Sequence, residues 1–132
     1  MIAVVTGATS GIGRAIAELL LERGDTVVGV GRSQTALAEL GANPRFIAIE
    51  HDLHDVDGLV TKLSATVAGL GGVDLLVNNA GVAEARSISE TTPSFFRETL
   101  DINLVAPAAA IHALWPQLAA SHGRIINVSS LA

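Results

Sequence analysis

The sequence TGATSGIG at residues 6–13 decides the fold of this chain. It follows the apolar run of residues 2–5, which is typical of a buried strand, and it precedes a helical pattern that ends at Gly24. Glycines between a strand and a helix let a pyrophosphate approach free backbone N–H groups, and the helix dipole adds to the attraction. The spacing is G-x-x-x-G-x-G rather than the commoner G-x-G-x-x-G, but the strand, turn and helix provide the required context. The sequence therefore predicts a phosphate-binding loop, with an ordinary glycine-rich turn as the alternative.

Composition favours one globular domain. Of the 132 residues, 49% are hydrophobic and 16% are charged, which predicts a large core or apolar surface that something else covers. The net charge of -5 argues against a nucleic-acid partner. Cysteine is absent, so disulfides and thiolate metal sites are excluded, and we expect no metal. The chain begins directly with a strand, and its apolar stretches are too short to span a bilayer. We therefore expect a soluble, cytoplasmic protein with no membrane partner.

Strand-like and helix-like segments alternate along the chain. Strands are expected at residues 2–5, 26–30, 45–50, 74–79 and 124–129. Helices are expected at residues 14–23, 34–40, 57–70 and 93–120. This alternation predicts an α/β fold, a Rossmann-type doubly wound parallel sheet of about five strands with helices on both faces. Residues 1–132 are expected to form a single dinucleotide-binding domain.

Polar residues follow the predicted strands at the edge where ligands bind in open parallel sheets. In chain order these endings are Thr6-Gly7, Gly31-Arg32-Ser33, Asp52, Asn78-Asn79-Ala80-Gly81 and Ser129-Ser130. One such ending is typical of a turn. Several on the same edge favour a ligand site.

Through these motifs taken together, the chain resembles the short-chain dehydrogenase/reductases, in the branch with a T-G-x-x-x-G-x-G loop. The resemblance covers essentially the whole sequence. The resemblance rests on residues 6–13, Asp52-Leu53, Asn78-Asn79-Ala80-Gly81, Asp101-Ile102-Asn103-Leu104 and Ile126-Asn127-Val128-Ser129-Ser130. It implies an oxidoreductase that transfers a hydride between a nicotinamide dinucleotide and a small carbonyl or alcohol substrate. It also implies a homo-oligomer in the full-length form.

The resemblance assigns the cofactor contacts to residues at this edge. The pyrophosphate would lie against the loop residues Thr6, Gly7, Ser10, Gly11, Ile12 and Gly13. Asp52 would accept a hydrogen bond from the adenine amino group, and Leu53 would offer its backbone; a helix N-cap or a solvated carboxylate is the alternative for Asp52. The adenosine ribose would lie along Asn79, Ala80 and Gly81, which also brace the fourth strand, and a purely structural turn is the alternative there.

The second predicted strand indicates which dinucleotide is preferred. An NAD site normally ends this strand in a carboxylate that accepts hydrogen bonds from the ribose hydroxyls, but Gly31 stands at that position. Arg32 follows and can offer a planar, permanently charged guanidinium to a 2′-phosphate. We therefore expect NADP rather than NAD, although Ser10 stands where NADP-dependent members often have a basic residue. The alternative for Arg32 is a solvated residue at a helix start.

The catalytic residues are where the chain departs from the family. Ser130 matches the serine that hydrogen-bonds the substrate oxygen, while strand-end capping is expected for Ser129. Asn103 matches the asparagine that keeps a proton-relay water in place, with a helix-kink residue as the alternative. The family places a tyrosine and a lysine after this serine, but the chain has no tyrosine, and Lys62 is its only lysine.

No other group replaces the missing tyrosine in this sequence. The histidines are expected to be surface residues rather than catalysts: His51, His54, His112 and His122. We therefore expect a truncated form of a protein roughly twice as long, inactive alone, without the C-terminal strands and helices of the family, or one half of an assembly completed by a second chain. The fifth strand would then be an exposed edge. A catalytically silent dinucleotide-binding module is the alternative function.

Overall fold

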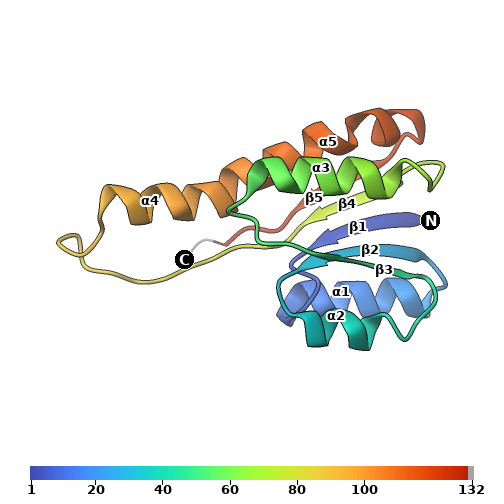
Figure 1. Cartoon of the computed structure of the whole chain (residues 1–132), viewed down its shortest axis with the longest axis horizontal. Coiled ribbons are helices and arrows are strands. Elements are labelled where there is room, and N and C mark those ends of the chain that lie inside the picture. Colours follow the sequence, from blue (N-terminus) through green and yellow to red (C-terminus); the bar gives the residue numbers. More distant parts are fainter. Residues whose placement is uncertain (131–132) are drawn as a thin grey trace.

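The alternating segments form one parallel sheet between two helical layers, as the computed structural model of residues 1–130 shows (Figure 1). Its strands are β1 (Ile2–Thr6), β2 (Thr26–Gly31), β3 (Phe46–Glu50), β4 (Leu75–Asn78) and β5 (Arg124–Asn127). They lie in the order β3-β2-β1-β4-β5, and every pairing is parallel. The predicted Rossmann-type, doubly wound α/β sheet is confirmed.

Helices cover both faces of the sheet. They are α1 (Gly11–Glu22), α2 (Gln34–Leu40), α3 (Val56–Val67), α4 (Pro93–Leu100), the π-helical turn η1 (Asp101–Val105) and α5 (Ala106–Ala120). Figure 1 shows α1 and α2 on one face and α3 and α5 on the other, while α4 extends past the end of the sheet. The connections are therefore crossovers that place a helix over the sheet between consecutive parallel strands.

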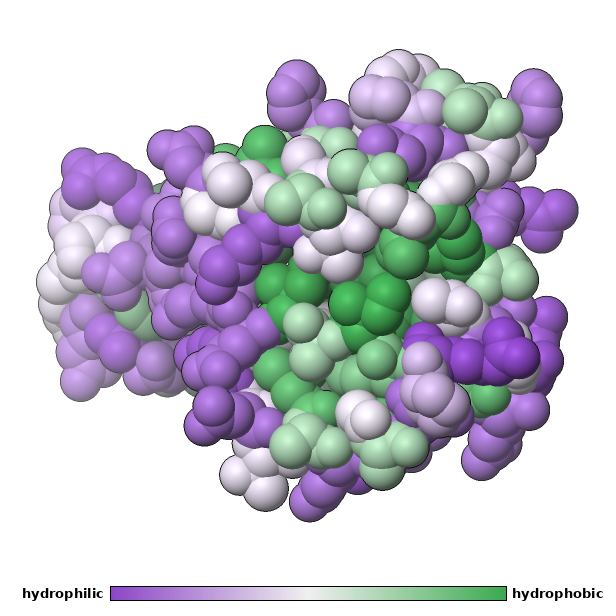
Figure 2. Space-filling view, turned by 45° about the vertical axis from the view of Figure 1, so that its right-hand side comes forward, coloured by the Kyte–Doolittle hydropathy of each residue, from purple (hydrophilic) through white to green (hydrophobic). Residues whose placement is uncertain are grey.

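The core consists of two apolar clusters, one on each face of the sheet. Successive residues of a strand point to opposite faces, so Val4 and Leu76 pack with α3 and α5, while Val5 and Val77 pack with α1. Strand β1 is apolar on both faces because both are covered. Figure 2 shows hydrophobic side chains gathered between the helical layers, and mainly hydrophilic residues over the arm that carries α4.

The helix expected at residues 93–120 is interrupted, which corrects the prediction of one continuous helix. Pro107 lacks an N–H and cannot donate the ordinary i→i−4 hydrogen bond to the carbonyl of Asn103. The helix there takes π-helical geometry over Asp101–Val105, where the backbone N–H of Ala106 bonds to the Asp101 carbonyl. The interruption places Asn103 in the π turn.

Several element boundaries also differ from the prediction, and three of them bear on the site or the sheet edge. Helix α1 begins at Gly11 rather than at residue 14, so the last two glycines of the loop lie in its first turn. Helix α3 begins at Val56, because Asp55 caps it by accepting a hydrogen bond from the backbone N–H of Gly58. Strand β5 ends at Asn127 rather than at residue 129.

The strand β5 forms one edge of the sheet, and all four of its residues are exposed. Apolar side chains remain on the surface there, with exposed fractions of 36% for Ile125, 49% for Ile126 and 39% for Val128. Within residues 1–130, none of the helices has the length and apolar character needed to cross a bilayer.

The first turn of α1 packs so closely on the end of β1 that only glycine fits at position 13. A Cβ atom at Gly13 would collide with the carbonyl group of Gly7 and with the side-chain amide of Asn79. Backbone atoms cannot yield as the end of a flexible side chain can. A larger residue at position 13 would therefore push α1 away from the sheet.

We predict that Gly13→Ala lowers the free energy of unfolding by about 1–3 kcal/mol, the usual cost of overpacking. Gly69→Ala is the matched control, because a Cβ there meets nothing within 4 Å, and it should change stability by less than about 1 kcal/mol. Urea midpoints measured at equal m-values give both numbers. Equal midpoints for the two variants would contradict the close packing at position 13.

Candidate functional site

Among the α-helices in residues 1–130 that begin after a loop, α1 is the one whose N-cap side chain does not bond to the backbone of the helix. The N-cap residues of α2, α3 and α4 are Ser33, Asp55 and Thr92, and each accepts a backbone hydrogen bond through its side chain. Ser10, the N-cap of α1, makes no such bond. The first N–H groups of a helix have no partner within it. This helix start therefore keeps donors for an anion.

The preceding turn depends on Gly7. Its φ of +69° lies in the left-handed region that side chains other than glycine rarely adopt. The turn reverses the chain between the end of β1 and the start of α1. It thereby aims the N-terminus of α1 at the carboxyl edge of the sheet.

Hydrogen bonds tie the end of β1 to the end of β4. The Thr6 hydroxyl accepts hydrogen bonds from the backbone N–H groups of Asn79 and Ala80, both at 3.1 Å. The Asn79 side-chain amide donates to the carbonyls of Thr6 at 3.1 Å and Gly7 at 3.5 Å. These are the bracing contacts expected of this segment. Contact with a ribose stays a prediction.

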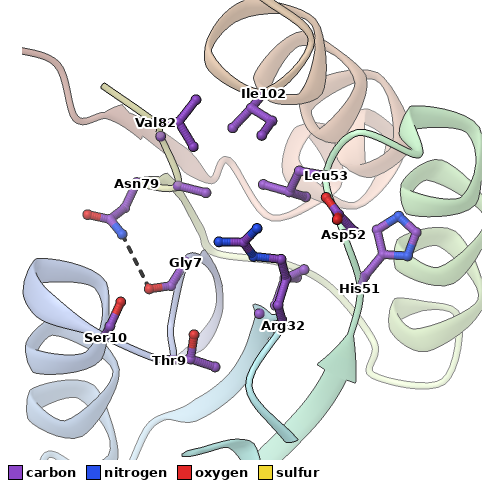
Figure 3. A pocket seen from close by; sticks show the side chains of 14 residues that line it. Gly7, Thr9, Ser10, Arg32, His51, Asp52, Leu53, Asn79, Val82 and Ile102 are labelled. Atoms are coloured by element: carbon purple, nitrogen blue, oxygen red, sulfur yellow. Dashed lines mark hydrogen bonds between the residues drawn. The ribbon is translucent and has the colours of Figure 1, made fainter. Parts of the chain in front are cut away.

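The carboxyl edge of the sheet contains an open cavity. The cavity brings together these predicted cofactor residues: Gly7, Ser10, Arg32, Asp52, Leu53, Asn79, Ala80 and Gly81. Figure 3 shows the Arg32 guanidinium extending into the cavity between the Gly7 turn and Leu53.

Other predicted residues lie around this cavity rather than in its lining. Thr6 and Gly13 are buried beneath the loop, whereas Gly11 and Ile12 are exposed in the first turn of α1. Ile12 has 64% of its surface exposed, so only its backbone is placed to serve an anion at this helix start.

The carboxylate of Asp52 is held by His54. Its Oδ1 accepts hydrogen bonds from the backbone N–H of His54 at 3.1 Å and from His54 Nδ1 at 2.9 Å. The backbone hydrogen bond first, then the side-chain one, lower the pKa of Asp52 below its usual value, and the charge of Arg32 adds to this. Asp55 caps α3, so the N-cap alternative for Asp52 is wrong.

His51 is buried, which corrects the expectation of a surface residue. Its Nε2 lies 2.6 Å from the carbonyl oxygen of Asp55, and since a carbonyl only accepts, Nε2 carries the proton. Figure 3 shows its ring turned toward α3. The contact holds the loop between β3 and α3 in place. The other histidines, His54, His112 and His122, are exposed as expected.

The two predicted catalytic residues lie outside the lining of the cavity, among residues 1–130. Asn103 accepts a hydrogen bond from the backbone N–H of Val82 and donates one to the carbonyl of Val82, both at 2.8 Å. It therefore ties the π turn to the segment that follows β4. Ser130 is exposed beyond the carboxyl end of β5.

The cavity lining also includes residues outside the predicted cofactor set: Thr9, Val30, Gly31, His51, Val82 and Ile102. Thr9 stands inside the predicted phosphate-binding loop, so its place in the sequence could have identified it as a cavity residue. A Cβ atom at Gly31 would collide with the Thr9 side chain. Thr9 therefore fills the space that a longer side chain at the end of β2 would need.

The chain matches the family model of short chain dehydrogenases over residues 1–132. It is 39% identical to cis-4-hydroxycyclohexanecarboxylate dehydrogenase of Sinomonas cyclohexanicum, covering 98% of this chain and 55% of that relative. It is 37% identical to 3-oxoacyl-[acyl-carrier-protein] reductase FabG of Vibrio harveyi, covering 98% and 54%. The chain thus spans about half the length of the curated relatives it matches.

Solved structures of short-chain dehydrogenases are also similar to this chain. A short-chain dehydrogenase from Streptomyces avermitilis has a TM-score of 0.91 and 39% identity, covering 98% of this chain and 48% of that one. A metagenomic short-chain oxidoreductase in complex with NADP has a TM-score of 0.88 and 34% identity, covering 100% and 62%.

We predict that Thr6→Val lowers the free energy of unfolding by about 1–3 kcal/mol, because it leaves two partly buried N–H groups without an acceptor. Thr6→Ser keeps the hydroxyl and should lose less. Thr61→Val is the control, since the Thr61 hydroxyl donates to the Asp57 carbonyl on an exposed helix surface. Denaturant titration of the variants measures the differences. A loss for Thr6→Ser as large as for Thr6→Val would contradict the role of the hydroxyl.

Proposed function

This chain belongs to the short-chain dehydrogenase family, and from that premise we propose that it binds NADP(H) in the cavity at the carboxyl edge of the sheet. The whole protein would transfer a hydride between this cofactor and a small carbonyl or alcohol substrate. The observation that carries the proposal is the uncapped start of α1 beside a cavity that the Arg32 guanidinium enters. When bound, the nicotinamide would supply the hydride donor or acceptor.

The first turn of α1 would hold the pyrophosphate. Its free N–H groups and the positive end of the helix dipole both favour an anion. Ser10, whose side chain does not cap the helix, lies in the cavity lining and is placed to add a hydroxyl contact. Gly7 lets the ligand approach the backbone because it has no side chain.

The end of β2 favours the 2′-phosphate of NADP. Gly31 offers no carboxylate, and Thr9 occupies the space beside it. Arg32 is the one arginine or lysine among the described residues that line the cavity. A neighbouring family structure that contains NADP supports this choice. A ribose with a free 2′-hydroxyl, as in NAD, would leave the guanidinium without its anionic partner.

The remaining residues would position the rest of the cofactor and the substrate. Asp52 would accept from the adenine amino group, Leu53 would offer its backbone, and the ribose would lie along residues 79–81. Asn103 would hold a proton-relay water and Ser130 would hydrogen-bond the substrate oxygen.

Proton transfer needs a group that these residues do not supply. The chain contains no tyrosine, and Lys62 Nζ donates to the Glu50 carbonyl at 2.8 Å. We therefore expect residues 1–132 alone to bind the cofactor without turnover. The whole protein would be a cytoplasmic homo-oligomer.

The proposal is tested by titrating the chain with NADPH and NADH and following nicotinamide fluorescence. We expect NADPH to bind more tightly, and Arg32→Ala to weaken NADPH about tenfold to hundredfold while leaving NADH nearly unchanged, the value of a charge-assisted hydrogen bond. Arg45→Ala removes an exposed arginine at the opposite end of the sheet and is the control. Absence of binding by either dinucleotide refutes the proposed function, and an Arg32→Ala variant that keeps its NADPH preference refutes the choice of NADP.

The contact between Gly31 and Thr9 predicts how the preference can be reversed. Gly31→Asp alone should weaken both dinucleotides, because its Cβ collides with the Thr9 side chain and displaces the loop. Thr9→Ala removes the two nearest atoms and leaves the Thr9 Cβ at 3.1 Å. The double variant should therefore bind NADH more tightly than NADPH, since its carboxylate accepts from the ribose hydroxyls and repels a 2′-phosphate. Equal behaviour of the single and double variants in the same titration would contradict this role of Thr9.

A further inference from the structure

His54, in the loop between β3 and α3, contacts Asp52 but has no role in the proposed function as described so far. His54 Nδ1 lies 2.9 Å from Asp52 Oδ1, and the backbone N–H of His54 donates to the same oxygen at 3.1 Å. An ionised carboxylate only accepts hydrogen bonds, so Nδ1 carries a proton in this contact. Two donors thus converge on one oxygen of Asp52.

This convergence fixes the rotation of the carboxylate. Because both hydrogen bonds use Oδ1, Oδ2 is left to accept from a ligand. The same hydrogen bonds, first from the backbone and then from the side chain of His54, lower the pKa of Asp52. Asp52 is therefore ionised at neutral pH, and it is a pure acceptor.

The orientation matters because Asp52 lies at the cavity. It lines the cavity together with Leu53 and Arg32, and Figure 3 shows Asp52 beside Leu53 on the cavity side of the chain, while His51 turns away. A pure acceptor at this place accepts from an amino group and repels a carbonyl oxygen. A site with such a fixed acceptor discriminates between ligands that differ in this one group.

We propose that His54 is a positioning residue that orients Asp52, so that the site selects a dinucleotide whose purine has a 6-amino group over one with a 6-oxo group. The proposal rests on the proposed cofactor site and deepens it, because it assigns base selectivity to a residue that does not itself touch the ligand. His54 is not among the residues that line the cavity, and its Nδ1 bonds to Asp52, so it acts through Asp52.

The backbone N–H of His54 could orient Asp52 without the imidazole, and two variants separate these contributions. His54→Ala keeps the backbone donor and removes Nδ1. His54→Asn places an amide nitrogen near the former position of Nδ1, at the same number of bonds from the backbone, and can restore the second hydrogen bond. His112→Ala is the control, since it removes an exposed histidine on α5.

The experiment compares the affinity of NADPH with that of its hypoxanthine analogue, in which a 6-oxo group replaces the 6-amino group and N1 carries a proton. The wild-type chain should prefer NADPH. His54→Ala should reduce the ratio of the two affinities about threefold to tenfold, the value of one hydrogen bond. His54→Asn and His112→Ala should keep the wild-type ratio. Circular dichroism of each variant checks that the fold is retained.

The outcomes separate this inference from the proposed function. An unchanged ratio in His54→Ala, with both dinucleotides still bound, overturns the inference and leaves the cofactor site standing. A ratio lowered equally in His54→Ala and His54→Asn also overturns it, because the loop would then need the bulk of the imidazole rather than its donor. If the wild-type chain binds neither dinucleotide, the proposed function fails and the inference fails with it.

Discussion

The close approach of α1 to the ends of β1 and β4 is the constraint on which the rest of the structure depends. The Asn79 amide reaches from the end of β4 to the carbonyls of Thr6 and Gly7, and α1 packs on the same atoms through Gly13. Two central strands and one helix therefore meet at a single point. The helix start is aimed at the carboxyl edge by this packing, so the proposed anion site would be a consequence of how the core closes.

The sheet could be predicted from the sequence because each strand is a short apolar run between polar endings. Parallel strands covered on both faces need such runs, and β1 shows it most clearly, with Ala3, Val4 and Val5 fully buried. The π turn could not be predicted in the same way. Pro107 indicates that one hydrogen bond is missing, but whether the helix kinks, ends or changes its hydrogen-bonding depends on the packing of α5 against α3 and the sheet.

The site was predictable where position alone brings residues together. The carboxyl ends of parallel strands share one edge, so Gly7, Arg32, Asp52 and Asn79 had to lie near one another. Side-chain directions in the loops were not predictable. The burial of His51 depends on a carbonyl four residues later, and the Thr9 contact depends on how the glycine loop folds over Gly31. No local pattern in the sequence marks either contact.

An acidic chain with a net charge of -5 does not attract a dinucleotide through its overall field. The attraction has to be local, since charges separated by more than about 8 Å are screened at physiological salt. Arg14, in the first turns of α1, is already paired with Glu18 at 2.8 Å and Glu39 at 2.9 Å. Within residues 1–130, Arg32 and the helix start are then the groups to which the proposed function assigns the phosphates. Because the favourable charge in the cavity lining is concentrated in one guanidinium, the proposed choice between dinucleotides would depend on very few atoms at the end of β2.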